Sequence, residues 1–283
     1  MNTEITNCYI CNIDDANFYD EENGYTYVKC NTCSLIYLNP RPISSDISEA
    51  HKTGMHRGDK VIHVTGRFKK SKISTYITIL KDFYTDGLSS FNNKSWLDIG
   101  CGNGEFLEAL KSINKNIKLK GSEPNEIKAS TCLKRGLDVE WIAHLDKHTV
   151  KYDYISLLNV YSHLPDPVEF ISKIKERLNP HGELFLQTGH SSHLPSTLHH
   201  KPYLAPDHLS FANREIVEGI LVKMGFEIIH TNIYRNEQFP SFKTPKRIFI
   251  EALKILLNKG GDMHNFFPKH PNRNMYIRAK LVE

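Results

Sequence analysis

The central part of the chain alternates between short apolar runs and longer segments whose apolar positions recur every three or four residues. Seven runs are predicted as strands: 94–100, 117–123, 137–143, 152–160, 182–189, 227–235 and 274–283. Helices are predicted to begin near Gly104, Pro124 and Asp166, and a further helix is predicted within 212–226. Continuous apolar strands that alternate with helices are typical of a parallel sheet covered on both faces. The pattern therefore predicts an α/β fold: a doubly wound, mostly parallel, seven-stranded, Rossmann-like sheet.

Two further segments precede this region. Residues 1–42 are polar and end in Asn-Pro-Arg-Pro, which favours an extended exit, so they are predicted to form a small separate unit. Residues 43–90 are predicted to form a helical lead-in, with a helix that ends at Gly87. The α/β domain is then expected to cover 91–283.

An insertion is predicted at about 236–273, between the last two strands. It contains the basic amphipathic stretch KRIFIEALKILL, residues 246–257. Such a helix is able to contact a membrane surface or a lipid-linked substrate. A lid or a homodimer face is the favoured interpretation, because one mixed amphipathic helix usually packs on protein.

Composition limits the class of protein. The 283 residues are 40% hydrophobic and 24% charged, which is enough for one large core and a small accessory unit. The N-terminus lacks the basic and apolar regions that a secretory leader has, and no apolar run reaches the length of a membrane span. A cytoplasmic protein is therefore expected. The net charge of +4 is spread along the chain, and strong nucleic-acid binding is not expected.

Four of the six cysteines form two Cys-x-x-Cys pairs near the N-terminus: Cys8, Cys11, Cys30 and Cys33. Eighteen residues separate the pairs, which is the spacing of a tetrahedral zinc site on two turns. Four thiolates leave zinc no open position, so a structural rather than a catalytic Zn²⁺ is predicted.

A glycine turn, Gly100-Cys-Gly-Asn-Gly104, follows the first predicted strand of the sheet. It lacks the lysine of a Walker A loop, and Glu105 stands where a diphosphate would lie, so phosphate ligands are disfavoured. Asp98 and Glu105 would attract a cation, and S-adenosylmethionine carries a sulfonium and no phosphate. Glu123, at the end of the next strand, is placed to accept hydrogen bonds from ribose hydroxyls. Cys101 is interpreted as a small packing residue.

From Trp96 to Phe226 the sequence resembles class I S-adenosylmethionine-dependent methyltransferases. The matching strings are LDIGCGNGEF, GSEPN, YDYISLLNVYSHLPDP and LNPHGELFLQTG. The resemblance implies a set of cofactor-binding residues: Asp98, Gly100, Gly102, Glu123, Ala143, His144 and Asn159. Gly100 and Gly102 would contact the methionine portion, Glu123 the ribose, and Ala143 and His144 the adenine. His144 departs from the family pattern, because relatives often carry an acid there.

The N-terminal unit, with its string CSLIYLNPRP, resembles the zinc ribbon of methyltransferases that act on small molecules and surface sugars, including sugar C-methyltransferases. Some ribosomal-RNA methyltransferases also begin with a zinc module, but they carry a histidine motif after the second cysteine pair. Methylation of base amino groups commonly uses an Asn/Asp-Pro-Pro-aromatic motif, which is absent after the fourth strand of the sheet.

Two histidines are candidates for the catalytic base. His163 follows the fourth strand of the sheet, and His208 lies in the string that leads to the last helix. A helix-cap or core role for His163 is an open alternative. Tyr161 and Tyr203 are candidate walls for a sugar ring, or packing residues. The remaining histidines of the loop, His190, His193, His199 and His200, have no metal-ligand spacing and are interpreted as solvated or substrate-facing.

These features predict methyl transfer from S-adenosylmethionine to an oxygen or carbon of a small molecule, a sugar or nucleotide-sugar. Two alternatives stay open. One is an RNA methyltransferase that uses the ribbon to bind RNA, and the other is a non-catalytic zinc-ribbon scaffold.

Overall fold

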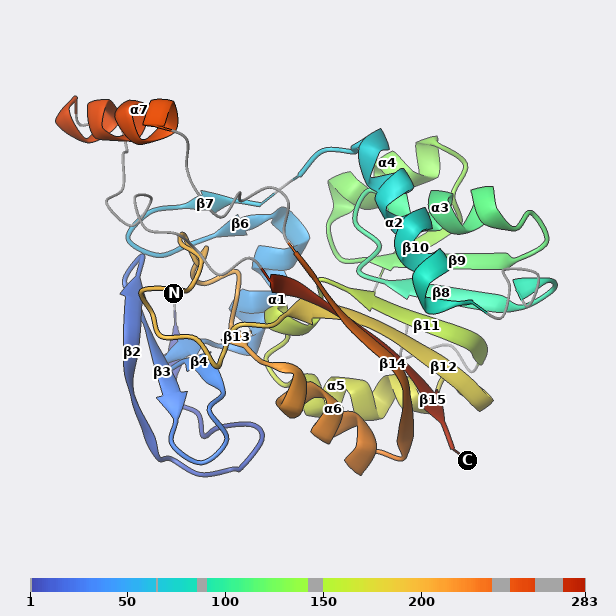
Figure 1. The fold of residues 1–283 in the computed structure, drawn as a ribbon, viewed down its shortest axis with the longest axis horizontal. Helices are drawn as coiled ribbons and strands as arrows, with labels where there is room; N and C mark the ends of the chain where they lie inside the picture. The colour runs from blue at the N-terminus through green and yellow to red at the C-terminus, as the bar shows by residue number, and fades with distance from the viewer. Residues whose placement is uncertain are drawn as a thin grey trace.

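A computed structural model describes residues 2–64, 66–85, 91–141, 150–235, 245–257 and 272–282. Its main sheet has seven strands in the order β10-β9-β8-β11-β12-β15-β14 (Figure 1). The bounds are β8 (Ser95–Ile99), β9 (Lys118–Glu123), β10 (Val139–Trp141), β11 (Tyr152–Leu158), β12 (Leu178–Gly189), β14 (Phe226–Arg235) and β15 (Asn272–Leu281). Only β15 runs opposite to the other six strands. The predicted doubly wound, mostly parallel sheet is confirmed.

Five helices accompany this sheet: α2 (Lys70–Phe83), α3 (Glu105–Ile113), α4 (Glu126–Lys134), α5 (Pro167–Lys175) and α6 (Arg214–Lys223). The predicted starts near Gly104, Pro124 and Asp166 are confirmed. At the start of α5, the Asp166 carboxylate accepts a hydrogen bond from the Glu169 backbone N–H, which satisfies a free donor of the first turn. The lead-in helix ends at Phe83, because Phe83 and Tyr84 turn into the core. Gly87 lies outside the described residues.

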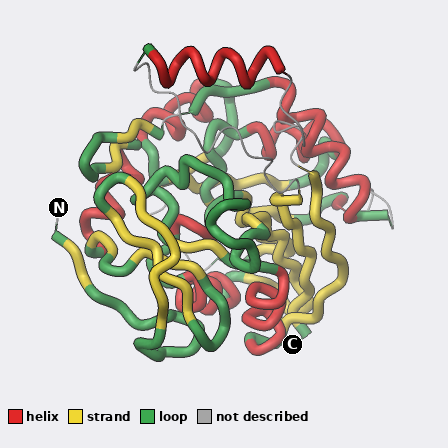
Figure 2. Tube along the Cα trace, turned by 60° about the vertical axis from the view of Figure 1, so that its left-hand side comes forward, coloured by secondary structure: helices red, strands yellow, loops and turns green. Residues whose placement is uncertain are grey.

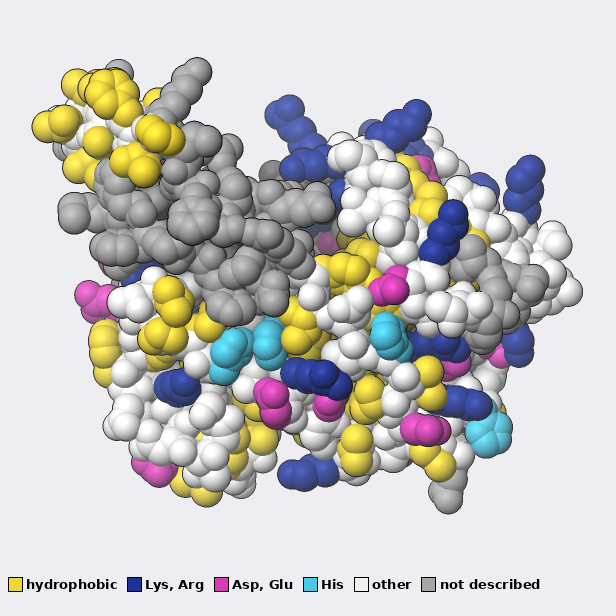
Figure 3. Space-filling model, in the orientation of Figure 1, with side chains coloured by type: hydrophobic (Ala, Val, Ile, Leu, Met, Phe, Trp, Pro, Cys, Tyr) yellow, Lys and Arg dark blue, Asp and Glu magenta, His cyan; other side chains and the backbone are white. Residues whose placement is uncertain are grey.

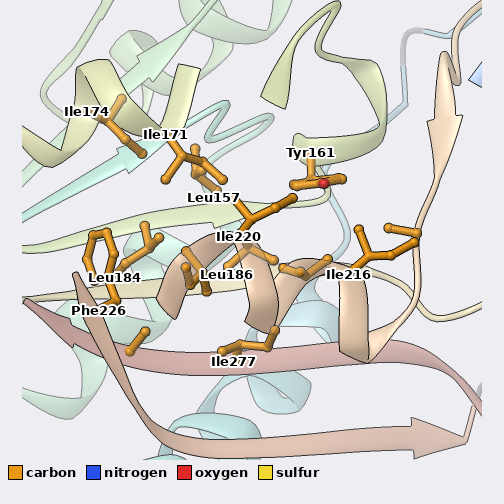
Figure 4. Packing of buried hydrophobic residues seen from close by; sticks show 14 of the residues in the cluster. Leu157, Tyr161, Ile171, Ile174, Leu184, Leu186, Ile216, Ile220, Phe226 and Ile277 are labelled. Carbon is orange, nitrogen blue, oxygen red and sulfur yellow. The ribbon is translucent and has the colours of Figure 1, made fainter. Parts of the chain in front are cut away.

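Alternate side chains of each central strand enter two different cores. On β8, Trp96 packs with α2 and α3, whereas Leu97 packs with α5 and α6. On β11, Tyr154 and Ile155 divide in the same way. Figure 4 shows the second core, between α6 and the strands. This period of two explains why both faces of the strands are apolar, and it leaves the carboxyl ends of the strands free to form a site.

The N-terminal region forms a smaller sheet in the order β13-β4-β3-β2, from β2 (Ala16–Glu22), β3 (Tyr25–Cys30), β4 (Ile36–Leu38) and β13 (Ser210–Phe211). Figure 2 shows these strands as a group apart from the main sheet. Strand β13 comes from the larger domain, and Ser210 pairs with Tyr37. The ribbon is therefore joined to the rest of the molecule by backbone hydrogen bonds. The domain boundary at residue 42 stays a prediction.

Short elements connect the two sheets. Strand β1 (Thr3–Glu4) pairs with β5 (Arg41–Pro42), and β6 (Met55–His56) pairs with β7 (Ile62–His63). Helix α1 (Ser44–Thr53) lies between β5 and β6 in sequence. It ends at Gly54, whose φ of 72° closes the helix in a left-handed cap. This places His51 and His56 close together, on either side of that glycine.

The described part of the predicted insertion contains α7 (Pro245–Leu256). Its apolar side chains are strongly exposed, with Phe249 at 69% and Leu256 at 81%, and they gather at the upper left of Figure 3. Whether this helix forms a lid or a dimer face stays a prediction. Among the described residues, no helix is long and apolar enough to span a membrane.

Candidate functional site

A cavity of about 410 Å³ lies at the carboxyl ends of β8, β9 and β11. We refer to it as the strand-end cavity. It brings together the predicted residues Asp98, Gly100, Gly102, Glu123 and Asn159. It also contains both candidate bases, His163 and His208. Most of the residues predicted for cofactor binding and catalysis therefore share one hollow.

The glycine turn forms the floor of this cavity. Gly100 has φ of +69°, and a Cβ atom there would lie 2.4 Å from Cγ2 of Val160, so only glycine fits. Gly102 has φ of +57°, and a Cβ atom there would meet nothing within 4 Å. Its backbone therefore faces open space, which a ligand is able to approach closely.

The carboxylate of Glu123 is held across the two strand ends. It accepts hydrogen bonds from the backbone N–H of Gly102, at 2.8 Å, and of Asn125, at 3.0 Å. Burial raises the pKa of Glu123, and the positive charge of Lys128, followed by these hydrogen bonds, partly opposes that effect. Each carboxylate oxygen keeps a second lone pair, so the group is still able to accept hydrogen bonds from a diol.

Asp98 lies one strand away and is buried. Burial raises the pKa of Asp98 to about 7; the negative charge of Glu123 adds to this effect, and a hydrogen bond from Ser156 opposes it. The Ser156 hydroxyl donates to Oδ1 of Asp98 at 2.6 Å and accepts from Nε1 of Trp96 at 3.0 Å. Two neighbouring carboxylates with raised pKa values would be stabilised in their charged forms by a cationic ligand.

Cationic side chains from the lead-in also line this cavity: Arg67, Lys69 and Lys72. The backbone N–H of Lys69 donates to Oε1 of Glu105 at 2.9 Å, which ties this segment to the glycine turn. These cations were not predicted as site residues. The sequence GRFKKSK carries the only local signal for them, a run of positive charge just before a helix.

The second wall is a group of five side chains that we call the histidine cluster: His51, His56, His163, Asp207 and His208. Asp207 is its centre. Its Oδ1 lies 3.1 Å from Nε2 of His56 and 3.2 Å from Nδ1 of His163. The ring of His208 stacks on that of His163 with centroids 4.6 Å apart. The ring of His51 meets His163 edge-on at 6.1 Å.

Charges in the cluster respond to burial and to Asp207. Burial lowers the pKa of His163, but the adjacent Asp207 carboxylate outweighs it, and the net shift is upward. Burial raises the pKa of Asp207, but the charge and hydrogen bond of His163 outweigh it and hold that pKa well below the usual range. Burial lowers the pKa values of His51 and His208 to about 4.

His51, His56 and Asp207 were missed by the sequence reasoning. The two histidines come from the lead-in, where the hydrophobic pattern is weak, and they lie far along the chain from His163. Asp207 is adjacent to the predicted His208, so its position was the one available signal.

A second cavity of about 300 Å³ adjoins the first, and we call it the loop cavity. Asn159, Leu204 and His208 line both cavities. Tyr203 and Phe211 contribute aromatic surface to the loop cavity. Because the two cavities share walls, the loop cavity is the natural place for a second ligand.

The other candidate side chains divide between the loop cavity and packing roles. Tyr161 is fully buried, and its hydroxyl accepts a hydrogen bond from the Tyr9 hydroxyl. It is therefore a core residue and not a wall of either cavity. His199 and His200 line the loop cavity. His190 accepts a hydrogen bond from the Arg214 backbone N–H at 3.1 Å. His190 and His193 are not among the lining residues described for the two cavities.

The four N-terminal cysteines converge on one point. Their sulfur atoms all lie within 4.8 Å of one another. The Cys8 and Cys33 sulfurs are 3.5 Å apart, well beyond the roughly 2.05 Å of a disulfide, and all four thiols are free. This arrangement fits a single tetrahedral ion. Cys101 instead packs in a small apolar cluster with Leu107 and Leu137, as predicted.

Ala143 and His144, predicted to contact adenine, lie outside the described residues. Their role stays a prediction.

Known proteins support the fold and the family. A family model described as "Methyltransferase domain" matches residues 74–231, more than half of the chain. A "Ubiquinone biosynthesis O-methyltransferase" of Shewanella pealeana is 29% identical over 102 residues, covering 34% of this chain and 43% of the relative. A protein of the same name from Salmonella paratyphi A is 26% identical, covering 38% and 47%. The chain thus spans less than half the length of these relatives.

Solved structures share the fold at low identity. A SAM-dependent methyltransferase from Archaeoglobus fulgidus has a TM-score of 0.52 and 19% identity, covering 75% of this chain and 94% of its own. The [4+2]-cyclase SpnF has a TM-score of 0.51 and 14% identity, covering 76% and 84%. A cyclase and a methyltransferase share this architecture, so the fold alone does not specify the reaction. The match over residues 74–231, together with the seven-stranded sheet, shows that the chain belongs to the family of methyltransferase domains.

Proposed function

We propose that this protein transfers the methyl group of S-adenosylmethionine to an oxygen or carbon of a small molecule. The observation that carries the proposal is the pair of buried carboxylates, Asp98 and Glu123, beside an open glycine turn. This set of groups suits a ligand with a positive centre and a ribose, and it disfavours a diphosphate.

The chain would hold the donor at three points. Glu123 accepts hydrogen bonds from the ribose hydroxyls. Gly102 gives close access to the backbone for the methionine portion, and Arg67 or Lys72, which line the same cavity, supply a positive charge for its carboxylate. The sulfonium is then attracted by Asp98, whose charged form it stabilises.

The reaction would be a direct displacement. The acceptor atom loses its proton to a histidine, His163 or His208, and attacks the methyl carbon. The carbon–sulfur bond breaks, and its electron pair stays on sulfur to give S-adenosylhomocysteine. Both histidines line the strand-end cavity, and His208 also lines the loop cavity, where the acceptor would enter.

A sugar or nucleotide-sugar is the proposed acceptor. The loop cavity combines aromatic surface from Tyr203 and Phe211 with hydrogen-bonding groups from Asn159, Ser191 and His200. Sugars use both kinds of contact, aromatic faces for their C–H surface and polar groups for their hydroxyls.

A phenolic acceptor is a second candidate. Leu194, Leu204 and Phe211 make part of the loop cavity apolar, and the curated relatives are named as O-methyltransferases of ubiquinone biosynthesis. An aromatic ring with one free hydroxyl would suit that lining as well as the same displacement chemistry.

The zinc ion proposed for Cys8, Cys11, Cys30 and Cys33 has a structural role. It would hold the two cysteine turns that support β3 and β4, and so keep the ribbon against β13. Tyr9, next to Cys8, bonds to Ser210 at 3.1 Å, which links the metal site directly to the loop-cavity wall.

The test uses S-adenosylmethionine with a tritiated methyl group, the full-length protein and a cell extract. We expect label to appear in the small-molecule filtrate, and not with the Glu123→Ala variant. A comparison of purified nucleotide-sugars with catechols then separates the two acceptor classes. Label that remains with RNA and is released by nuclease would contradict the proposal and favour the RNA methyltransferase alternative.

A further inference from the structure

We propose that His51, His163 and Asp207 bind a divalent transition-metal ion in the wall of the strand-end cavity. One ligand atom from each of these side chains lies within 4.8 Å of the other two. Atoms that share one metal ion at about 2.1 Å are at most about 4.2 Å apart, so the three groups are close to a coordinating arrangement. This site is separate from the four cysteines of the ribbon.

The chemistry of the three groups is suited to such an ion. Two imidazoles and one carboxylate on one side of a metal leave its other positions open, a set that Zn²⁺, Fe²⁺ and Co²⁺ all accept. Asp207 is buried, with 4% exposure, and it is shared by two histidines. A cation would neutralise this buried carboxylate more fully than a single imidazolium does.

Surrounding groups orient the proposed ligands. Nδ1 of His163 lies 2.8 Å from the backbone carbonyl oxygen of Asp207, an acceptor that requires the proton on Nδ1. The lone pair is then on Nε2, whereas Nδ1 is the nitrogen that lies 3.2 Å from Oδ1 of Asp207. Binding one ion together with Asp207 therefore requires the ring to turn, or the ion to replace the proton on Nδ1. Nε2 of His56 lies 3.1 Å from Asp207 and holds that carboxylate in place. We therefore assign His56 as a positioning residue.

The place of the site suggests what the ion would do. Its three ligands line the same cavity as Glu123 and the glycine turn. An ion here would coordinate an oxygen of the acceptor and hold it beside the donor. This role rests on the proposed function, whereas metal binding itself does not. With His163 as a ligand, the role of base passes to His208, which borders both cavities.

Cobalt titration of the full-length protein tests the site. Mild chelation first brings the protein to one zinc per chain, held by the ribbon, and Co²⁺ is then added up to millimolar concentration. We expect one further cobalt per chain, with the weak visible bands of nitrogen and oxygen ligands and without the intense thiolate-to-cobalt band of a cysteine site. His51→Ala and Asp207→Asn should each weaken this binding by at least about 100-fold, and His56→Ala by about 10- to 100-fold.

His63→Ala is the matched control, because His63 is exposed on β7 and lies outside the cluster. It should bind cobalt as the unaltered protein does. Circular dichroism checks that each variant is folded, and His51→Ala serves if Asp207→Asn does not fold. The proposal is overturned if the folded protein binds no second cobalt, or if that cobalt survives His51→Ala. Titration of the same samples with S-adenosylhomocysteine separates failure of the metal site from failure of the proposed function.

Discussion

Asp98 and Glu123 are two buried carboxylates at the ends of neighbouring strands. Burying their charged forms costs free energy, which a suitable ligand would offset. Neither has a lysine or arginine partner among the ion pairs of the described residues. A buried carboxylate without such a partner has a raised pKa, as both of these have. The positive charge of Lys128 already offsets part of this effect at Glu123. The sulfonium of S-adenosylmethionine would supply a positive charge beside Asp98, and its ribose would supply hydrogen bonds to Glu123.

This argument predicts how donor affinity depends on pH. The pKa of Asp98 is about 7 in the free protein, and a sulfonium favours the ionised form. Lowering the pH through 7 protonates Asp98, so affinity for S-adenosylmethionine should fall by up to about tenfold per pH unit, relative to S-adenosylhomocysteine. Equilibrium dialysis of both ligands from pH 8 to 5 measures the ratio. Asp98→Asn should make the ratio independent of pH, and an unchanged ratio in the unaltered protein would refute the assignment.

Glu123 should be required for binding of the adenosyl group. Each hydrogen bond to a charged group contributes about 1.5–3 kcal/mol, so Glu123→Ala should weaken S-adenosylhomocysteine by roughly 100-fold or more. Thermal unfolding with and without this ligand detects the loss, because bound ligand raises the melting temperature. Glu126→Gln is the control, since that side chain is exposed on α4 and lies outside the cavity. Equal ligand stabilisation of the Glu123 and Glu126 variants would favour the non-catalytic scaffold.

Measuring both kcat and cobalt binding should distinguish the roles of the two candidate bases, His163 and His208. His208→Ala should lower kcat by about 10²- to 10⁴-fold, the range for loss of a general base, and leave cobalt binding intact. His163→Ala should lower both. If His208→Ala retained full turnover with the physiological acceptor, His208 would not be the base.

The positions in the fold of residues with local sequence signals were predictable, and their roles stay predictions. Glu123 and the glycine turn follow strands, and their positions relative to those strands determine where they point. Only two of the five members of the histidine cluster were predicted, because it combines side chains from α1, β6, the 3-10 turn after β11 and the loop before β13. Their meeting depends on how the lead-in packs across the strand ends, which no short pattern encodes. Tyr161 failed as a wall for a related reason: its side chain turns into the core toward Tyr9.

At the scale of elements, the strands and helices of the main sheet were predictable because their apolar periods are strong. The end of α2 was harder to predict. The helix ends at Phe83, before any glycine, and the side chains of Phe83 and Tyr84 both pack in the core. The pairing of β13 with β4 was not predictable, because a strand of two residues has no period of its own. That pairing lets the ribbon support Ser210 and Phe211, which line the loop cavity.

Loss of the ribbon zinc should therefore have a local effect and a distant one. In Cys8→Ser, β3 and β4 should lose protection in hydrogen exchange, while β8, β11 and β12 keep theirs, because the main sheet has its own cores. Turnover should fall, because the loop-cavity wall at Ser210 depends on Tyr9 and β4. Binding of S-adenosylhomocysteine should persist. Equal loss of protection in both sheets would contradict a ribbon that is stabilised separately by its metal.

At the scale of the whole molecule, three units meet around one edge of the main sheet. The strand ends supply the donor site, and the lead-in supplies cations and two histidines. The loop before α6 supplies the acceptor wall, and the ribbon supports that wall through the pairing of β4 with β13. A small-molecule acceptor fits cavities of about 410 and 300 Å³ better than an RNA does. On the face shown in Figure 3, the lysines and arginines are also scattered rather than gathered into a groove.

The most direct test of the central claim is a calorimetric titration of zinc-loaded, full-length protein with S-adenosylhomocysteine. The account predicts saturable binding of one molecule per chain in the strand-end cavity. A folded sample that releases no heat and shows no binding across a range of temperatures would contradict it.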